Sequence, residues 1–219
     1  MKERGMIFNG EMVRAILDGR KTQTRRIMKV QPQPCNHANW PDYSPDSQWK
    51  SYPNGWCCAV CANGTTIDHR HHAKGINCPY GAVGDRIWVR ETWAEAGASA
   101  PDLKLYHANY PAHVPTHYEN VPPVDEIRWT PSIHMPRWAS RILLEVTDVR
   151  VERLASISDD DAGKEGYPAN PEPYGGGMDK WLWFRQLWDS IYPDQSFKHN
   201  PWVWVIEFKV VPNVQDNTA

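Results

Sequence analysis

The feature that most constrains the fold is a short helical segment that passes through a glycine directly into a strand. Apolar residues recur at helical spacing between Asn9 and Leu17, which predicts an amphipathic helix. Asn9 is suited to cap its first turn, and Gly19 can take the left-handed conformation that ends many helices. Residues 22–27 are rich in β-branched side chains and predict a strand. Junctions of this kind are places where functional sites form.

The junction itself, residues 19–26, is strongly basic and contains two threonines. Its cations are Arg20, Lys21, Arg25 and Arg26. A charge run of this kind is most often a solvated turn. However, the mixture of an amine, guanidinium groups and the Thr24 hydroxyl also supplies a candidate base and a candidate nucleophile. Lys21 and Thr24 can meet only if Lys21 is still in the turn, because side chains three apart in a strand point to opposite faces.

The overall charge limits the partners of the chain. With 219 residues and a net charge of −2, the protein has no global attraction to nucleic acid, so any such binding must come from local clusters. Tight binding to duplex DNA is therefore not expected. Twelve tryptophans need either core positions or stacking partners, and core packing accounts for most of them.

The chain start and the cysteines indicate a compartment. Residues 1–5 are charged and lack the apolar segment of a signal peptide, and no apolar run is long enough to cross a membrane. We therefore expect a cytoplasmic protein. In a reducing compartment, five cysteines are better explained as free thiols or metal ligands than as disulfides.

A first insertion, residues 30–80, has no sustained periodicity and contains all five cysteines. Cys58 and Cys61 have the spacing at which two thiolates hold one tetrahedral zinc ion, and Cys35 with Cys78 completes four ligands. A nearby histidine could replace one thiolate, and unligated cysteines are an equally good explanation. If zinc is bound, it is expected to be structural, since four protein ligands leave no open position.

A strand is predicted from Arg86 to Thr92 by the alternation of charged and apolar residues. Arg86, Trp88 and Arg90 would share one face, either as a surface that stacks bases and contacts phosphates or as cation–π packing at the rim of a barrel. Glu91 follows directly and is expected to pair with an arginine of the basic signature at residues 19–26, as a structural ion pair or within a binding site.

The rest of the chain predicts a second insertion and three further elements. Residues 96–136 form the insertion. Arg137 with Trp138 repeats the pairing of a basic and an aromatic residue, and the two could line the same pocket. A strand is predicted at 141–149, an amphipathic helix at 179–192 and a final strand at 202–211, followed by a frayed tail at 213–219. Ser158 starts a short helix that carries Glu165 in its last turn. We expect a single domain over residues 1–212.

Several motifs, taken in order, resemble those of the ASCH domain, a PUA-like small β-barrel family associated with RNA. They are Gly19-x-Lys21-x-x-Thr24-x-Arg26, Gly84-Asp85, Glu145-Val146-Thr147, Asp161-Ala162-x-x-Glu165, Ile191-Tyr192-Pro193 and Val205-Ile206-Glu207-Phe208-Lys209. Within that family they are most similar to the bacterial N4-acetylcytidine amidohydrolase, and the whole chain resembles longer members carried by phages and prophages. The resemblance covers the barrel segments and leaves both insertions uncovered.

The resemblance implies an α+β fold, a PUA-like small barrel with flanking helices and the two insertions. It implies that Thr24 is a nucleophile, Lys21 its activating base and Glu165 an acid and base in the hydrolysis of N4-acetylcytidine, without a catalytic cofactor. RNA or a modified nucleoside is the expected partner, with Arg25 and Arg26 as candidate contacts. A non-catalytic RNA reader and a ribonuclease remain the alternatives.

Overall fold

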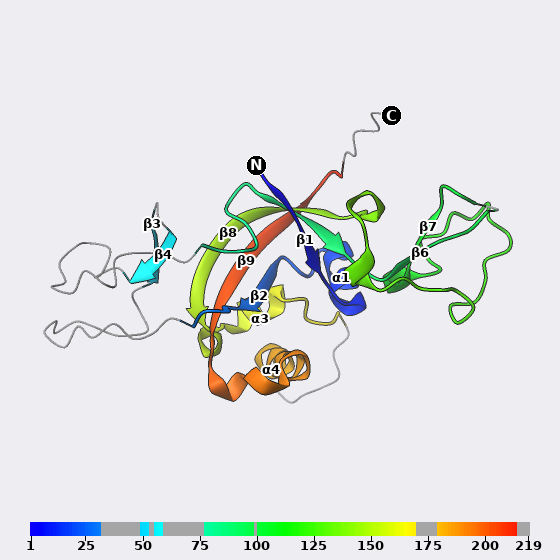
Figure 1. Cartoon of the computed structure of the whole chain (residues 1–219). Helices are drawn as coiled ribbons and strands as arrows, with labels where there is room; N and C mark the ends of the chain where they lie inside the picture. The colour runs from blue at the N-terminus through cyan, green and yellow to red at the C-terminus, as the bar shows by residue number, and fades with distance from the viewer. Residues whose placement is uncertain (32–48, 53–54, 59–76, 99, 170–178, 214–219) are drawn as a thin grey trace, which may run out of the picture.

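The computed structural model describes residues 1–31, 49–52, 55–58, 77–98, 100–169 and 179–213, the two short segments at 49–58 by their backbone only (Figure 1). Its main element is a five-stranded sheet with the order β1-β5-β8-β9-β2. The strands are Glu3–Ile7 (β1), Arg86–Arg90 (β5), Leu143–Arg153 (β8), Trp202–Val211 (β9) and Gln23–Ile27 (β2). β1 and β5 are parallel, the other pairs are antiparallel, and β8 and β9 form one long curved ribbon (Figure 1).

Three α-helices and two small hairpins accompany the sheet. The helices are Gly10–Leu17 (α1), Asp159–Lys164 (α3) and Asp179–Ile191 (α4). The hairpins pair Trp49–Tyr52 (β3) with Gly55–Cys58 (β4), and Trp93–Glu95 (β6) with Lys104–Tyr106 (β7). Short 3-10 helices lie at His107–Asn109, Ser132–His134, Arg137–Ala139, Leu154–Ser156, Pro193–Gln195 and Phe197–His199. This mixture confirms the predicted α+β class. In the part of the chain described, no helix combines the length and apolar character needed to cross a membrane.

The capping residues act as the sequence predicts. The Asn9 side chain accepts a hydrogen bond from the Met12 amide at 2.8 Å, and Gly19 has φ +73°. The Ser158 hydroxyl likewise accepts from the Asp161 amide at 3.1 Å and starts α3. These local rules place both ends of α1 and the start of α3.

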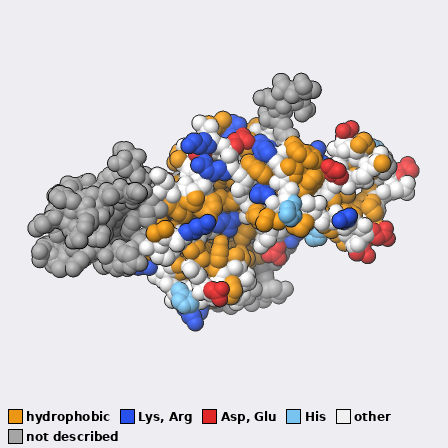
Figure 2. Space-filling view, viewed as in Figure 1, with side chains coloured by type: hydrophobic (Ala, Val, Ile, Leu, Met, Phe, Trp, Pro, Cys, Tyr) orange, Lys and Arg blue, Asp and Glu red, His pale blue; other side chains and the backbone are white. Residues whose placement is uncertain are grey.

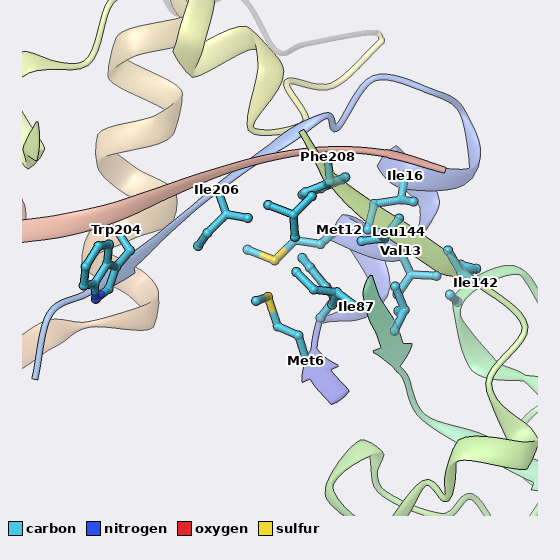
Figure 3. Close-up of a cluster of buried hydrophobic side chains, with 14 of the residues drawn as sticks. Met6, Met12, Val13, Ile16, Ile87, Ile142, Leu144, Trp204, Ile206 and Phe208 are labelled. Carbon is cyan, nitrogen blue, oxygen red and sulfur yellow. The ribbon is translucent and has the colours of Figure 1, made fainter. Parts of the chain in front are cut away.

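The main core lies between α1 and one face of the sheet (Figure 3). Met12, Val13 and Ile16 supply the apolar face of the helix. From the sheet come alternate residues of β1, β5, β8 and β9, among them Met6, Ile87, Leu144, Ile206 and Phe208. Each of these five sheet residues is at most 5 % exposed. Truncating one of the larger side chains to alanine is therefore expected to lower the free energy of unfolding by roughly 2–5 kcal/mol.

Two odd-numbered residues in the first half of β9 face a second core under α4. Val203 and Val205 pack there with Phe184 and Trp188 of the helix. Because both faces of β9 are buried over residues 202–206, this part of the strand is a continuous apolar run rather than an alternation.

The sheet is open between β1 and β2, where the resemblance implied a closed small barrel. These two strands are the edges of the sheet, and they do not pair with each other in the described structure. One side chain crosses the opening: Arg26 of β2 donates to the carbonyl oxygen of Ile7 in β1 at 3.0 Å. A side-chain donor thus takes the place of a strand ladder at this edge.

Candidate functional site

The signature turn is held to the end of α1 and to the turn after α3. The amides of Arg20 and Lys21 both donate to the Ala15 carbonyl oxygen, at 2.8 and 2.9 Å. The Arg20 guanidinium also donates to the carbonyl oxygens of Gly166 and of the residue after it, at 3.1 and 2.8 Å. Two turns far apart in the chain are therefore joined by direct hydrogen bonds.

Lys21 and Glu165 form a buried ion pair between those turns. Lys21 Nζ lies 2.7 Å from Glu165 Oε2 and donates to the Glu165 carbonyl oxygen at the same distance. Their side chains are 0 % and 3 % exposed. Gly166 permits this approach, because a Cβ there would lie 2.9 Å from the Ala15 Cβ and 3.3 Å from the Lys21 Cβ. The structure thus brings together two residues that are 144 positions apart.

The surroundings of Lys21 weaken its hold on a proton. Complete burial lowers the pKa of Lys21, and the Glu165 carboxylate acts in the opposite direction. Arg26 and then Arg25 add smaller effects that lower it further. Loss of solvent is thus the largest cause of the lowered pKa, and the neighbouring arginines add to it. A lysine of this kind can act as a base closer to neutral pH than an exposed one.

Arg25 is enclosed by carboxylates on the same side of β2. Its guanidinium lies 3.2 Å from Glu165, 3.2 Å from Glu152 and 3.4 Å from Asp161, and its side chain has no solvent exposure. Burial acts to raise the pKa of Asp161, but the charge of Arg25 and other nearby cations outweighs it and lowers that pKa. Arg25 therefore holds the site together and is closed to an RNA phosphate as it stands.

Thr24 lies on the other face of β2. Gln23 and Arg25, its neighbours, both contact Asp161 of α3, and a strand alternates its side chains between faces. Thr24 is paired in register with the core residue Ile206 and is 1 % exposed. The alternation therefore puts the Thr24 side chain and the Lys21–Glu165 pair on opposite faces of the strand.

Arg26 shares the face of Thr24 and is partly exposed. Its guanidinium lies 5.4 Å from the centre of the Phe8 ring and crosses the opening between the two edge strands. Of the two arginines named as candidate RNA contacts in the signature, Arg26 is the accessible one.

Arg86, Trp88 and Arg90 form a row on the outer face of β5, as the alternation predicted. The intervening Ile87 and Val89 are buried in the core. The Arg90 guanidinium lies 5.4 Å from the centre of the Trp88 ring and donates to the carbonyl oxygen of Ile133. Among the described residues, neither arginine of the row makes an ion pair with a carboxylate.

Gly5 of β1 leaves the space that the Trp88 and Arg90 side chains of this row occupy. It lies opposite Trp88 in the register, and a Cβ at Gly5 would come within 2.6 Å of the Trp88 ring and 2.9 Å of Arg90 Cδ. No real Cβ makes contacts this short, so only glycine allows the indole and the arginine to lie where they do.

Glu91 pairs with Arg141 and not with an arginine of the signature. Both of its carboxylate oxygens accept from Arg141, at 2.9 and 3.0 Å, and it is 1 % exposed. Burial raises the pKa of Glu91, against the effect of Arg141. Arg141 also donates to Asn109, so this pair joins the sheet to the second insertion.

Arg137 and Trp138, predicted to line one pocket, point to different neighbours. Arg137 lies 2.9 Å from Glu3 of β1 and also donates to Asn213. Trp138 makes an edge contact with Trp93, with ring centres 5.3 Å apart, on the side of the second insertion. It is half exposed.

Two of the four proposed zinc ligands lie outside the described residues. Cys35 and Cys61 are not described, and Cys58 is described only by its backbone at the end of β4. Cys78 is a free thiol that packs against the main core, and burial raises its pKa to about 11. The described residues contain no group of three metal-binding side chains, which leaves the zinc hypothesis as a prediction.

Sequence reasoning missed Arg150, which organises the carboxylates around the candidate site. Its guanidinium contacts four of them, in Asp148, Glu152, Asp161 and Glu207. The sequence pattern that could have predicted this role is Asp148-x-Arg150-x-Glu152, in which an arginine and two acids share one face of β8.

Comparisons with known proteins return similar solved structures only. No family model matches the sequence, and no curated protein matches it. The chain is similar to the crystal structure of an ASCH domain from Lactobacillus crispatus JV V101, with 11 % identity over 97 % of this chain and 81 % of that one, and a TM-score of 0.42. It is also similar to a DUF984 protein from Enterococcus faecalis V583, with 7 % identity over 100 % and 86 % of the two chains and a TM-score of 0.40.

Proposed function

We propose that the protein acts on RNA or on modified pyrimidine nucleosides and hydrolyses the N4-acetyl amide of N4-acetylcytidine. The observation that supports this most is the buried contact of 2.7 Å between Lys21 and Glu165, in which burial lowers the pKa of the lysine. An amine that releases its proton readily, beside a carboxylate that can pass the proton on, can supply the base and the acid of an amide hydrolysis.

In the proposed reaction the Thr24 hydroxyl attacks the acetyl carbonyl, and its proton reaches Lys21 by way of a bound water molecule, because the two side chains lie on opposite faces of β2. Glu165 then delivers a proton to the departing N4 amine as the carbon–nitrogen bond breaks. Water hydrolyses the resulting acetyl-threonine ester and releases acetate. Arg26 lies on the same face of β2 as Thr24 and is suited to stabilise the oxyanion. Because Thr24 and the proton-transferring pair lie on opposite faces, the substrate would have to bind at the free edge of β2.

A non-catalytic RNA reader is the second candidate, and two observations favour it. The face of β2 that carries Thr24 is turned away from Lys21 and Glu165. The outer row of Arg86, Trp88 and Arg90 combines an indole with two arginines, the combination that holds a base and its phosphates. A reader needs only these contacts.

The deciding experiment is to incubate the purified protein with N4-acetylcytidine and measure released cytidine and acetate. We expect Thr24→Ala to abolish release, whereas Thr22→Ala, which removes an exposed threonine of the same turn, should leave it unchanged. Lys21→Ala and Glu165→Gln should abolish it as well. Circular dichroism of each variant checks that the domain is folded.

Three outcomes are distinguishable. No release by the wild-type protein, with salt-sensitive binding of a labelled RNA oligonucleotide, would establish the reader instead. Shortened RNA products would favour the ribonuclease. Release of acetate that survives Thr24→Ala but not Glu165→Gln would show that a water molecule, and not Thr24, is the nucleophile.

A further inference from the structure

A pocket of about 520 Å³ opens at the end of β2, away from the Lys21–Glu165 pair. This volume is in the range of small-molecule sites. Ile27 and Met28 of the β2 end line one side, and the end of α4 with the following turn lines another. Its walls are mainly apolar, with Lys29, Gln31, Asp194 and Gln195 as polar residues, and Tyr80 and Tyr192 are the aromatic residues that line it.

Both tyrosine hydroxyls are available to a ligand. In the described part of the chain, neither the Tyr80 nor the Tyr192 hydroxyl has a hydrogen-bond partner. The Tyr192 ring is held in place by Trp188, with ring centres 4.6 Å apart. Partial burial raises the pKa of Tyr80, so it remains a phenol that can both donate and accept.

A path of cations and rings leads from the outer face of β5 to this pocket. Trp88 and Arg90 lie at its start, and Ile7, the register partner of Arg90, is 43 % exposed. Arg26 donates to Ile7 and lies close enough to Tyr80 to affect its ionisation. Figure 2 shows Lys and Arg side chains set among hydrophobic ones over the middle of one face of the molecule.

We propose that the Tyr80–Tyr192 pocket holds one base of a single-stranded RNA whose backbone follows this path. Flat aromatic rings in apolar walls accept a base by stacking, free phenols can bond its edge, and Arg26 and Arg90 neutralise phosphates. This rests on the proposed function and extends it: the preferred substrate is an RNA strand of several nucleotides, and the nucleoside is only the reacting part.

The test is the binding of a short fluorescein-labelled oligocytidylate without acetyl groups, which needs no catalysis. We expect the double variant Tyr80→Phe, Tyr192→Phe to bind about 10-fold more weakly, since each lost hydrogen bond costs roughly a factor of three or more. Ile191→Glu, which puts a negative charge at the exposed mouth of the pocket, should weaken binding by at least about 10-fold. Arg90→Gln should remove one phosphate contact, so the negative slope of log affinity against log salt concentration should become less steep by about 0.7.

Matched controls lie in the second insertion. Tyr118→Phe and Val124→Glu, the latter at an exposed position, should bind as the wild type does. Wild-type affinity in the pocket variants would overturn the pocket proposal and leave the deacetylation proposal intact. Absence of oligocytidylate binding by the wild type would overturn it too, and acetate release from the free nucleoside would then show that the proposed reaction survives alone.

Discussion

Thr24 and Arg25 are neighbours in β2 but serve different faces of the sheet. Arg25 is surrounded by three carboxylates, while Thr24 faces the core beside Ile206. The sequence required Lys21 to remain in the turn if it was to meet Thr24. Lys21 does precede the strand, but its amine turns to Glu165. The contact of Lys21 with Glu165, at the end of α3, therefore directs the amine away from Thr24.

Gly5 provides a prediction at the level of a single residue. Gly5→Ala places a methyl group within 2.6 Å of the Trp88 ring, so the indole and Arg90 must move. We expect a loss of roughly 1–3 kcal/mol in the free energy of unfolding, as for other overpacked sites. Urea denaturation measures it.

Gly10→Ala is the matched control, because the nearest atom to its added Cβ lies 3.6 Å away, an ordinary contact. Gly10 starts α1, where alanine is the better helix former. Equal losses in the free energy of unfolding for the two substitutions would show that the contact of Gly5 with Trp88 is not the cause.

The second insertion is an element with its own anchoring contacts. The β6–β7 hairpin leads into it from the sheet. Beyond the insertion the chain is joined to the sheet again by the Glu91–Arg141 ion pair. The Arg141 guanidinium also lies 4.1 Å from the centre of the Tyr106 ring. His113 Nε2 accepts a hydrogen bond from the Tyr106 amide at 3.0 Å, so this nitrogen must be unprotonated.

This contact predicts that acid weakens the insertion. Burial, and then the charge of Arg141, lower the pKa of His113. The folded state therefore resists protonation that the unfolded chain accepts, and stability falls as the pH drops below about 6.5. We expect the urea midpoint to fall less between about pH 7.5 and pH 5.5 in His113→Asn than in the wild type. His134→Asn, at an exposed position, should keep the wild-type fall, and an unchanged fall in His113→Asn would contradict the prediction.

The first insertion carries the zinc prediction. If Cys35, Cys58, Cys61 and Cys78 hold one ion, chelator-washed protein should keep about one zinc per chain by elemental analysis. Cys58→Ser with Cys61→Ser should lose it and lower the melting temperature, because a structural zinc contributes directly to folding. Less than stoichiometric metal in the wild type would remove the hypothesis.

For the whole molecule, Arg150 joins elements that are distant in sequence. Through four carboxylates it links β8, β9 and α3, and Arg25 extends the network to β2. Burial acts against its charge, but the hydrogen bonds of Glu152 and Glu207 outweigh this and raise the pKa of Arg150. One side of the sheet is thus held by this charge network together with the smaller apolar core under α4, and the other side by the main apolar core.

Arg150→Met should therefore destabilise the whole domain. It removes the cation that the four acids share and leaves only Glu152 and Asp161 paired with Arg25, and we expect a loss on the order of 2 kcal/mol, given the partial exposure of the group. Crowded acids bind protons more readily in the folded state than in the unfolded chain, so the variant should recover stability as the pH falls toward about 5. Thermal melting across this range measures it, with Arg150→Lys expected in between. A constant deficit at every pH would contradict the electrostatic explanation.

The elements could be predicted where local rules decide them. The cap at Asn9, the stop at Gly19 and the two faces of β5 follow from residue type and spacing, and all three are confirmed. The partner of Glu91 could not be predicted, because Arg141 and the signature arginines are equally suitable donors in sequence. The candidate site was predicted in part: Lys21 and Glu165 came from motifs, while Arg150 was missed.

The sequence alone determined the periodicities, the helix ends and the types of residue that can carry chemistry here. These depend on neighbours within one or two turns, whose geometry the backbone dictates. Only the tertiary structure decided that Lys21 is buried beside Glu165, that Thr24 faces away from both, and that the sheet stays open between β1 and β2. Those outcomes depend on which distant groups exclude water from one another, and such contacts form only when the whole core packs.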